Sequence, residues 1–314
     1  MKFYFIVSSP ENAPGKVLLN KLKPLGKVIV MQHVGKLSGL RELQDDKDEK
    51  ILALFPVAFN WDLDVETIKK IPRVKAVCIS STSFDWVKPK KLRQMGIPAC
   101  NTPGFANDSV AEYALSMAIE TARGVPLMIK NNWKYHFDNN HTIILKGKTA
   151  GIIGLGRVGT RMAELCQGIG MEVVYWSRKS RNKRFEYIEL DKLFKTSDLI
   201  MPALVESEET KKLITRRRLD LMKKKAIMVG INRVRALWDE KYILKKVRNE
   251  EIFGYAMEGE SVKSVFNYKG NVWPLPAMIW FTDDSLKKFK EIWVENVINA
   301  SLGKYSNQIN NYDK

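Results

Sequence analysis

Cysteine and histidine are scarce in this sequence, with three of each among 314 residues. Cys78, Cys100 and Cys166 lie in apolar surroundings without CxxC spacing, which argues against a disulfide framework and a cysteine-bound metal. An odd number of cysteines in a chain of this size is typical of reduced thiols, so we expect a cytoplasmic protein without a metal site.

Long hydrophobic runs are absent as well. No apolar run reaches the length of a membrane-spanning helix, and the opening MKFYFIVSSP is too short for a signal peptide. With 45% hydrophobic and 28% charged residues, the composition is that of a soluble globular protein, and the chain is long enough for two domains. We therefore expect no association with a membrane.

Acidic residues are outnumbered, since 35 aspartates and glutamates face 52 lysines and arginines, for a net charge of +17. Such a charge can reflect nucleic-acid binding, attraction of anionic substrates or a lysine-rich proteome. The basic residues are spread along the whole chain, and no aromatic residues interleave them as single-strand binding requires. This distribution disfavours specific nucleic-acid binding.

The most informative stretch is TAGIIGLGRVGTRMAELCQGIGMEVVYWSR, residues 149–178. Residues 149–153 predict a buried strand, residues 157–170 have a helical pattern, and residues 171–176 predict a second apolar strand. Glycines in the spacing G-x-G-x-x-G lie between the first strand and the helix. This order of elements is the context that a dinucleotide-binding fingerprint requires.

Each glycine of this turn has a predicted role. Gly154 permits the tight turn, Gly156 lets the backbone approach a pyrophosphate, and Gly159 lets the helix pack close to the sheet. Arg157 and Val158 open the helix, whose unpaired N–H groups and positive dipole end favour phosphates. We expect these five residues to bind the cofactor; the alternative is a glycine turn without a ligand.

The residue after the second strand distinguishes the two nicotinamide dinucleotides. An NAD site usually carries Asp or Glu there, roughly 20 residues past the first glycine, to bind the ribose 2′-hydroxyl. This sequence has Ser177, followed by Arg178, Lys179 and Arg181. With cations to bind a 2′-phosphate and no carboxylate to repel it, the loop favours NADP over NAD. Alternatively, the loop is only part of a generally basic surface.

Strands and helices are predicted to alternate on both sides of this stretch, as in a doubly wound α/β fold. The other expected strands cover residues 2–7, 28–31, 51–54, 74–80, 97–100, 198–201, 226–231, 253–257 and 271–273. The other expected helices include residues 64–70, 87–95, 190–196, 216–222, 239–247 and 283–302.

A hydroxyl-rich loop, residues 80–86, follows the strand at 74–80. In such sheets ligands bind outside the carboxyl ends of the strands, where backbone N–H groups and hydroxyls can hold a carboxylate. Ser81, Thr82 and Ser83 are therefore candidate substrate-binding residues, although an ordinary Ser/Thr turn is an equally good interpretation.

A helix is predicted to begin at Ser109, which has the spacing of a capping box with Glu112. A stripe of mostly small residues runs along this helix at Ala111, Ala114, Leu115, Ala118 and Ala122. Because small residues permit another helix to approach closely, the stripe predicts a buried connector or a subunit interface.

Several motifs occur in the order found in one enzyme family. They are NTPGFANDSVAEYAL, LKGKTAGIIGLGRVG, GMEVVYWSR, TSDLI, ETKKLI, LMKKKAIMVGINRVRALWDE and NVWPLPAMIWFT. Through this ordered set the sequence resembles the D-isomer-specific 2-hydroxyacid dehydrogenases over essentially its whole length. The glycine fingerprint alone is common to many folds, whereas the ordered set is much more specific.

The resemblance implies two doubly wound parallel-sheet domains, with a Rossmann cofactor domain inserted in a flavodoxin-like substrate domain. Residues 1–100 and 287–314 would form the substrate domain, and residues 101–286 the NAD(P)-binding domain. Family members are usually dimers built on the cofactor domains, so a homodimer is implied. The implied reaction is hydride transfer between a nicotinamide dinucleotide and a small 2-keto or 2-hydroxy acid.

The resemblance also implies roles for individual residues. Arg235 matches the arginine that binds the carboxylate and carbonyl oxygen of the substrate, although Arg233 competes for this role. Asn232 lies in the same segment and Glu258 replaces an aspartate that holds the nicotinamide amide, so both are expected at the cofactor. Residues 81–83 match the carboxylate-binding loop, where the family commonly has glycines.

The sequence departs from the family at the acid–base pair. The family's proline–histidine pair falls on Pro276 and Ala277, and the glutamate partner falls near Lys263, with Glu260 the nearest carboxylate. The three histidines, none of which follows the fingerprint, are His33, His136 and His141. A forming alkoxide still needs a proton, for which water, Lys263 and His136 from a second subunit are all candidates.

Three functions remain open from the sequence. The first is an NAD(P)-dependent reductase of a small 2-keto acid. The second, suggested by Ala277, is a dinucleotide-binding sensor or scaffold that has lost its acid–base pair. The third and weakest is a nucleic-acid-binding protein, suggested only by the net charge.

Overall fold

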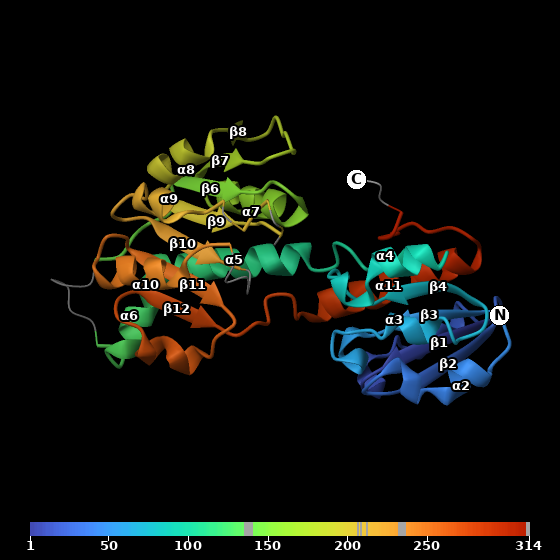
Figure 1. The fold of residues 1–314 in the computed structure, drawn as a ribbon. Helices are drawn as coiled ribbons and strands as arrows, with labels where there is room; N and C mark the ends of the chain where they lie inside the picture. Colours follow the sequence, from blue (N-terminus) through green and yellow to red (C-terminus); the bar gives the residue numbers. More distant parts are fainter. Residues whose placement is uncertain (135–140, 206, 208, 212, 232–236, 312–314) are drawn as a thin grey trace. The chain divides into compact units, whose positions relative to one another are not determined.

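The computed structural model describes residues 1–134, 141–205, 207, 209–211, 213–231 and 237–311. The chain divides into two compact units, Met1–Phe105 with Thr282–Lys314 (unit 1) and Ala106–Phe281 (unit 2) (Figure 1). Unit 2 is therefore an insertion in the sequence of unit 1. The sequence predicts domain boundaries after residues 100 and 286, and the substrate and cofactor roles of the two domains stay predictions.

Unit 1 is built on a parallel sheet of five strands in the order β2-β1-β3-β4-β5, the flavodoxin-like order. The strands are β1 (Lys2–Val7), β2 (Lys27–Gln32), β3 (Lys50–Leu54), β4 (Val74–Ile79) and β5 (Ala99–Cys100). They are short β-branched and apolar runs, as expected for strands that are covered on both faces. The sequence predicted all five, and the bounds shift by one or two residues.

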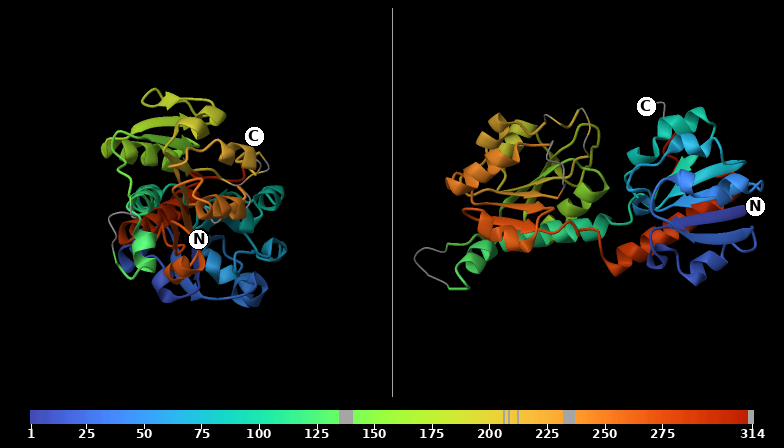
Figure 2. Two further views of the ribbon diagram at one scale, coloured as in Figure 1. Left: turned by 90° about the vertical axis from the view of Figure 1, so that its left-hand side faces the viewer. Right: turned by 60° about the horizontal axis from the view of Figure 1, so that its bottom comes forward.

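Alternate residues of these strands face opposite layers. In β1, Phe3 and Phe5 pack with Trp293 of helix α11 (Asp283–Ser301), and the Trp293 indole N–H donates a hydrogen bond of 2.9 Å to the carbonyl of Cys78. Figure 2 shows α11 in red beside the blue strands. Tyr4 and Ile6 belong to the opposite core. That core receives α2 (Arg41–Asp45), α3 (Val65–Ile68) and α4 (Pro89–Gln94).

Unit 2 contains seven parallel strands in the order β12-β11-β10-β9-β6-β7-β8. The strands are β6 (Thr149–Ile153), β7 (Glu172–Trp176), β8 (Glu186–Tyr187), β9 (Leu199–Pro202), β10 (Ile227–Gly230), β11 (Gly254–Glu258) and β12 (Val272–Leu275). The chain moves outward from β6 to β8 and then returns to β9 on the other side of β6. This is the Rossmann order with one further strand, and its switch point lies between β6 and β9.

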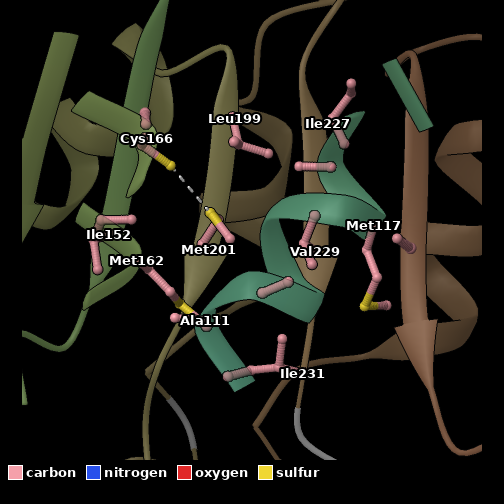
Figure 3. Packing of buried hydrophobic residues seen from close by; sticks show 14 of the residues in the cluster. Ala111, Met117, Ile152, Met162, Cys166, Leu199, Met201, Ile227, Val229 and Ile231 are labelled. Carbon is pink, nitrogen blue, oxygen red and sulfur yellow. Dashed lines mark hydrogen bonds between the residues drawn. The ribbon is translucent and has the colours of Figure 1, made fainter. Parts of the chain in front are cut away.

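Helices cover both faces of this sheet. On one face α5 (Asn107–Ala122) and α7 (Arg157–Gly168) pack together. In Figure 3, α5 crosses in front of the β10 strand that carries Ile227 and Val229, and its Ala111 lies beside Met162 of α7. The opposite face is covered by α8 (Leu190–Thr196), α9 (Arg216–Asp220) and α10 (Glu240–Arg248). The predicted α/β class with two doubly wound parallel sheets is confirmed.

The small-residue stripe of α5 lies in the core of unit 2. Its alanines are all buried: Ala111, Ala114, Ala118 and Ala122. They pack in the layer formed by α5, α7 and the sheet. Of the two interpretations that the sequence left open, the structure therefore supports close packing inside the unit for these four alanines.

The predicted capping box at Ser109 is wrong. Helix α5 begins at Asn107 with Ala106 at the N-cap position, and no side chain caps it. Gly104 has a φ of +76° and turns the chain directly into the helix, so that Val110 N–H already bonds to the carbonyl of Ala106 at 3.0 Å. The Ser109 hydroxyl therefore lies inside the first turn, where it donates to the Ala106 carbonyl.

No helix in the described part of the chain is long and apolar enough to span a bilayer. The three cysteines are buried and reduced. Burial raises the pKa of the Cys166 thiol to about 12, so this thiol is protonated at neutral pH.

Candidate functional site

The first glycine of the fingerprint forms the turn between β6 and α7. Gly154 has a φ of +98°, a conformation that side chains of L-residues rarely adopt. A Cβ atom at this position would lie 2.7 Å from the carbonyl oxygen of Ala203, at the end of β9. The Gly154 N–H donates to the carbonyl of Trp176, at the end of β7. The turn is therefore fixed between the two neighbouring strands and has room only for glycine.

The other two glycines differ in what surrounds them. A Cβ at Gly159 would lie 1.9 Å from the Gly154 carbonyl oxygen, so Gly159 allows α7 to pack onto the turn. A Cβ at Gly156 would meet no described atom within 4 Å. Gly156 is not required by packing against the described residues, and a side chain there would instead fill the open space at the helix N-terminus. This is the pattern expected where a pyrophosphate approaches the backbone.

The N-terminus of α7 is available to an anion. Gly156 occupies the N-cap position without a side chain to cap the helix, and the first turn carries no acidic residue. The predicted cofactor-binding residues Arg157 and Val158 form the start of this helix. The first N–H groups of a helix have no partner within it, and its dipole is positive at this end. The open space, the glycine turn and the uncapped helix together fit a dinucleotide phosphate.

Several side chains of the basic loop after β7 already bind other residues of the protein. Ser177 is buried, and its hydroxyl accepts a hydrogen bond of 3.2 Å from the Ser180 N–H. Arg178 forms an ion pair with Glu209. Arg181 donates to the carbonyl of Ser177 and lies 4.1 Å from the centre of the Tyr187 ring. A 2′-phosphate at this loop would therefore compete with Glu209 for Arg178, while Lys179 is exposed to solvent.

The described candidate cofactor residues lie along the carboxyl-terminal side of the sheet of unit 2. Gly154, Ser177 and Glu258 lie at the carboxyl ends of the parallel strands β6, β7 and β11. Burial raises the pKa of Tyr113 of α5, and the charge of Glu258 contributes to the same shift. Ligands of such sheets bind at this edge, at the switch point of the strand order. The predicted residues Asn232, Arg235 and the competing Arg233 lie outside the described residues.

The predicted carboxylate loop follows β4 in unit 1, and its three carbonyl groups are all held. The carbonyl of Ser81 accepts from the Thr102 N–H at 3.1 Å. The carbonyl of Thr82 accepts from the Asn101 side-chain amide at 2.8 Å. The carbonyl of Ser83 accepts from the Ser81 hydroxyl at 2.7 Å and from the indole N–H of Trp86 at 3.1 Å.

The N–H groups of the same loop have no such partners. Across the described ranges, no hydrogen bond is donated by the backbone N–H of Ser81, Thr82 or Ser83. Consecutive N–H groups that are not used within the protein form an anion-binding surface, because each carries a partial positive charge. The arrangement fits a carboxylate, and the role of this loop in substrate binding stays a prediction.

The segment that carries the family's histidine is described in full. Ala277 lies two residues after the end of β12 and is half-buried, while Lys263 is exposed in the 3-10 helix η5 (Val262–Asn267). His141 is exposed, and His136 lies outside the described residues. His33 belongs to unit 1, where its ring lies 5.9 Å from that of Phe59.

Two groups of residues that support these sites were not predicted from the sequence. Ala203 confines the glycine turn, and Trp86, Asn101 and Thr102 hold the loop after β4. The signal for Asn101 and Thr102 was present, because they follow the strand that neighbours β4. No local pattern shows that the Trp86 indole turns back onto residues 81–83, or that Glu209 meets Arg178.

Comparison with known proteins agrees with this geometry. Residues 113–266 match the sequence profile of the D-isomer specific 2-hydroxyacid dehydrogenase, NAD binding domain. Residues 113–266 therefore form an NAD-binding domain of this family. A glyoxylate reductase from Thermococcus litoralis is 26% identical over 269 residues, which cover 80% of this chain and 81% of the relative. A glyoxylate reductase from Pyrococcus furiosus is 26% identical over 320 residues and is covered to 93%, with 96% of this chain.

Solved structures of this dehydrogenase fold superpose on almost the entire chain. An acyclic imino acid reductase in complex with NADPH and D-Arg gives a TM-score of 0.80 at 22% identity, covering 98% of this chain and 100% of that one. A glyoxylate reductase from Paecilomyes thermophila gives a TM-score of 0.81 at 20% identity, covering 98% of both chains. At these identities the likeness establishes the fold.

Proposed function

We propose that the protein is an NAD(P)-dependent oxidoreductase that interconverts a small 2-keto acid and the corresponding 2-hydroxy acid. The observation that carries the proposal is the turn at Gly154, Gly156 and Gly159, which leaves an uncapped helix N-terminus at the switch point of a Rossmann sheet. This turn lies within the matched NAD-binding domain of the family.

Residues of unit 2 would hold the cofactor. The N–H groups at the start of α7 would hold the pyrophosphate, Ser177 and its basic loop would hold the adenosine ribose, and Glu258 would hold the nicotinamide amide. When bound, a nicotinamide dinucleotide supplies or accepts the hydride. We infer a preference for NADP for two reasons. Ser177 occupies the position at which an NAD site usually has a carboxylate, and Arg178 and Lys179 add positive charge that favours a 2′-phosphate.

The chain supplies the groups that bind the acid. The N–H groups of residues 81–83 would bind its carboxylate, and Arg235 is the proposed ligand of the carboxylate and carbonyl oxygen. Reduction adds a hydride to C2 and a proton to the carbonyl oxygen. Because Ala277 occupies the usual histidine position, that proton must come from another group or from water. Glyoxylate is the first substrate to test, since the relatives named above are glyoxylate reductases.

One observation favours a second function, a dinucleotide-binding sensor or scaffold without turnover. Ala277 cannot donate a proton, and a positioned acid typically contributes about 10²–10⁴-fold to such a reaction. The sensor hypothesis predicts tight cofactor binding with no consumption of any keto acid.

We also propose a cytoplasmic homodimer. The support for the dimer is a set of exposed apolar side chains on unit 2, at Ile119, Trp133 and Phe266. The support for the location is the set of three reduced, buried cysteines. Light scattering during gel filtration is expected to give twice the chain mass of 36.0 kDa; a mass of one chain would contradict the dimer.

The test of the function is consumption of NADPH and of NADH with glyoxylate, hydroxypyruvate and pyruvate. Binding of each cofactor is measured separately by its fluorescence. Turnover with any of these acids supports the reductase, and the two cofactors are compared by kcat/KM. Cofactor binding without turnover across a broad set of keto acids would contradict it and favour the sensor.

A further inference from the structure

The side chain of Trp86 bonds directly to the carboxylate loop. Trp86 lies in the 3-10 helix η4 (Asp85–Val87) and is 6% exposed. Its indole N–H lies 3.2 Å from the Ser81 hydroxyl oxygen and 3.1 Å from the Ser83 carbonyl oxygen. A single donor therefore contacts both ends of residues 81–83. The Ser81 hydroxyl also links the two ends of the loop, because it donates a hydrogen bond to the Ser83 carbonyl.

The indole is held independently of that loop. Its ring is stacked on Phe59 with a centroid distance of 6.3 Å and an interplanar angle of 19°. Trp61 packs against it edge-on at 6.3 Å. The Trp86 carbonyl accepts from the Leu63 N–H at 3.0 Å. The orientation of the donor is thus set by residues 59–63, in the segment that follows β3.

The consequence concerns the N–H groups of the loop. The carbonyl of one residue and the N–H of the next belong to the same planar peptide group, so a partner on the carbonyl also fixes the direction of that N–H. Thr102 and Asn101 hold the carbonyls of Ser81 and Thr82 and so fix the N–H groups of Thr82 and Ser83. Trp86 and the Ser81 hydroxyl hold the carbonyl of Ser83, whose peptide group carries the N–H of Phe84 at the end of the loop. Loss of the indole N–H would leave the Ser83 end of the loop with one partner fewer and its peptide orientation less fixed.

We propose that Trp86 is a positioning residue for the substrate carboxylate, and that its indole N–H acts by fixing the Ser81 hydroxyl and the Ser83 carbonyl at the two ends of the loop. The proposal rests on the proposed function, in which these residues bind the carboxylate. Trp86 itself does not contact the substrate. An aromatic ring that only fills the core would be replaceable by phenylalanine without effect on carboxylate binding.

The test compares two equivalent substitutions in the full-length protein. Trp86→Phe keeps an aromatic ring against Phe59 and removes the N–H donor. Trp61→Phe is the matched control, since Trp61 packs on the same ring, is 51% exposed and makes no hydrogen bond to the loop. KM and kcat for glyoxylate are measured, together with the Kd of oxamate, an unreactive carboxylate, and the Kd of NADPH.

Trp86→Phe is expected to raise the KM for glyoxylate and the Kd of oxamate about tenfold, which corresponds to about 1.4 kcal/mol and lies within the range for a lost hydrogen bond. The kcat and the Kd of NADPH should change little, and Trp61→Phe should resemble the wild type. Ser81→Ala removes the hydroxyl that links the indole to Ser83 and should act in the same direction, which keeps the test valid if Trp86→Phe folds poorly.

The proposal would be overturned if Trp86→Phe and Ser81→Ala both bound oxamate with the same Kd as the Trp61→Phe control. A wild-type protein that binds no oxamate would also overturn it. A wild type that binds oxamate but reduces no keto acid would contradict the proposed function alone, and weaker oxamate binding by Trp86→Phe would then still support the role of Trp86.

Discussion

Single glycines decide whether unit 2 can accept a dinucleotide, and each does so by a different physical route. Gly154 is required by its positive φ and Gly159 by the 1.9 Å distance that a Cβ would have to the Gly154 carbonyl. Gly156 is required by neither, because no described atom lies within 4 Å of its Cβ position. Substitution at Gly156 therefore separates cofactor binding from folding.

Gly156→Ala is expected to leave the melting temperature of the protein without cofactor close to that of the wild type, since alanine adopts its φ of −83° without strain. The added methyl group occupies the space proposed for the pyrophosphate, so the Kd of NADPH should rise by at least about tenfold. Gly168→Ala is the control, because its Cβ also meets no described atom. Unchanged NADPH binding by Gly156→Ala would argue against the phosphate site.

Gly159→Ala should instead destabilise unit 2. The Cβ would overlap the Gly154 carbonyl oxygen, which belongs to the backbone and cannot move without opening the turn. Overpacking of this kind typically costs about 1–3 kcal/mol, so thermal unfolding should shift down by several degrees. A melting temperature equal to that of Gly156→Ala would show that the turn is less tightly packed than in this structure.

The pairing of Arg178 with Glu209 predicts how cofactor preference can be changed. Glu209→Gln frees Arg178 for a 2′-phosphate and should lower the Kd of NADPH a few-fold without changing that of NADH. Arg178→Ala should raise the Kd of NADPH about tenfold. Lys183→Ala, which removes an exposed cation from the same loop, controls for general surface charge. Equal effects of all three substitutions on both cofactors would contradict a 2′-phosphate site.

At the scale of the elements, hydrophobic pattern was sufficient for every strand except β8. Buried parallel strands are short apolar runs, and the pattern located the other strands of both sheets to within a few residues. The start of α5 was predicted less well, because the backbone turn at Gly104 begins the helix before Ser109, where the capping pattern placed it. Short elements without a clear apolar period, such as α2 and the two-residue strand β8, were not predicted at all.

One contact between elements predicts how the stability of unit 1 depends on pH. The Tyr4 hydroxyl of β1 donates to the Asp46 carboxylate at 2.6 Å, directly after α2. Burial, followed by this hydrogen bond, raises the pKa of Tyr4 to about 12. Burial of Asp46 opposes its ionisation, but hydrogen bonds from Tyr4, Asp48 and Lys2 outweigh burial and hold the pKa of Asp46 well below its usual range.

The two pKa shifts change stability in opposite directions of pH. The stabilisation from Tyr4 is fully present below pH 10 and is lost as the pH rises towards about 12. That from Asp46 is present above its ordinary pKa and is lost as the pH falls. The free energy of unfolding, measured in urea, should therefore be lower for Tyr4→Phe than for the wild type at pH 7. This difference in free energy should shrink above pH 10. A difference independent of pH would contradict the contact.

At the scale of the whole molecule, the sequence predicted the family, both sheets and the glycine turn, because these depend on local pattern and on ordered motifs. It could not predict that Trp86 holds the carboxylate loop, since its indole reaches the loop through packing that no sequence spacing encodes. It also left the proton donor open, because Ala277 replaces the expected histidine and the candidates come from different parts of the chain.

The most direct test of hydride transfer is to supply NADPH carrying deuterium at C4 of the nicotinamide, in separate preparations for each face, together with glyoxylate or pyruvate. Mass spectrometry of the acid then shows whether deuterium has reached C2. We expect a deuterated 2-hydroxy acid from one of the two labelled cofactors, and its loss in Arg235→Ala. A protein that binds NADPH but yields no deuterated product with any keto acid would contradict the account.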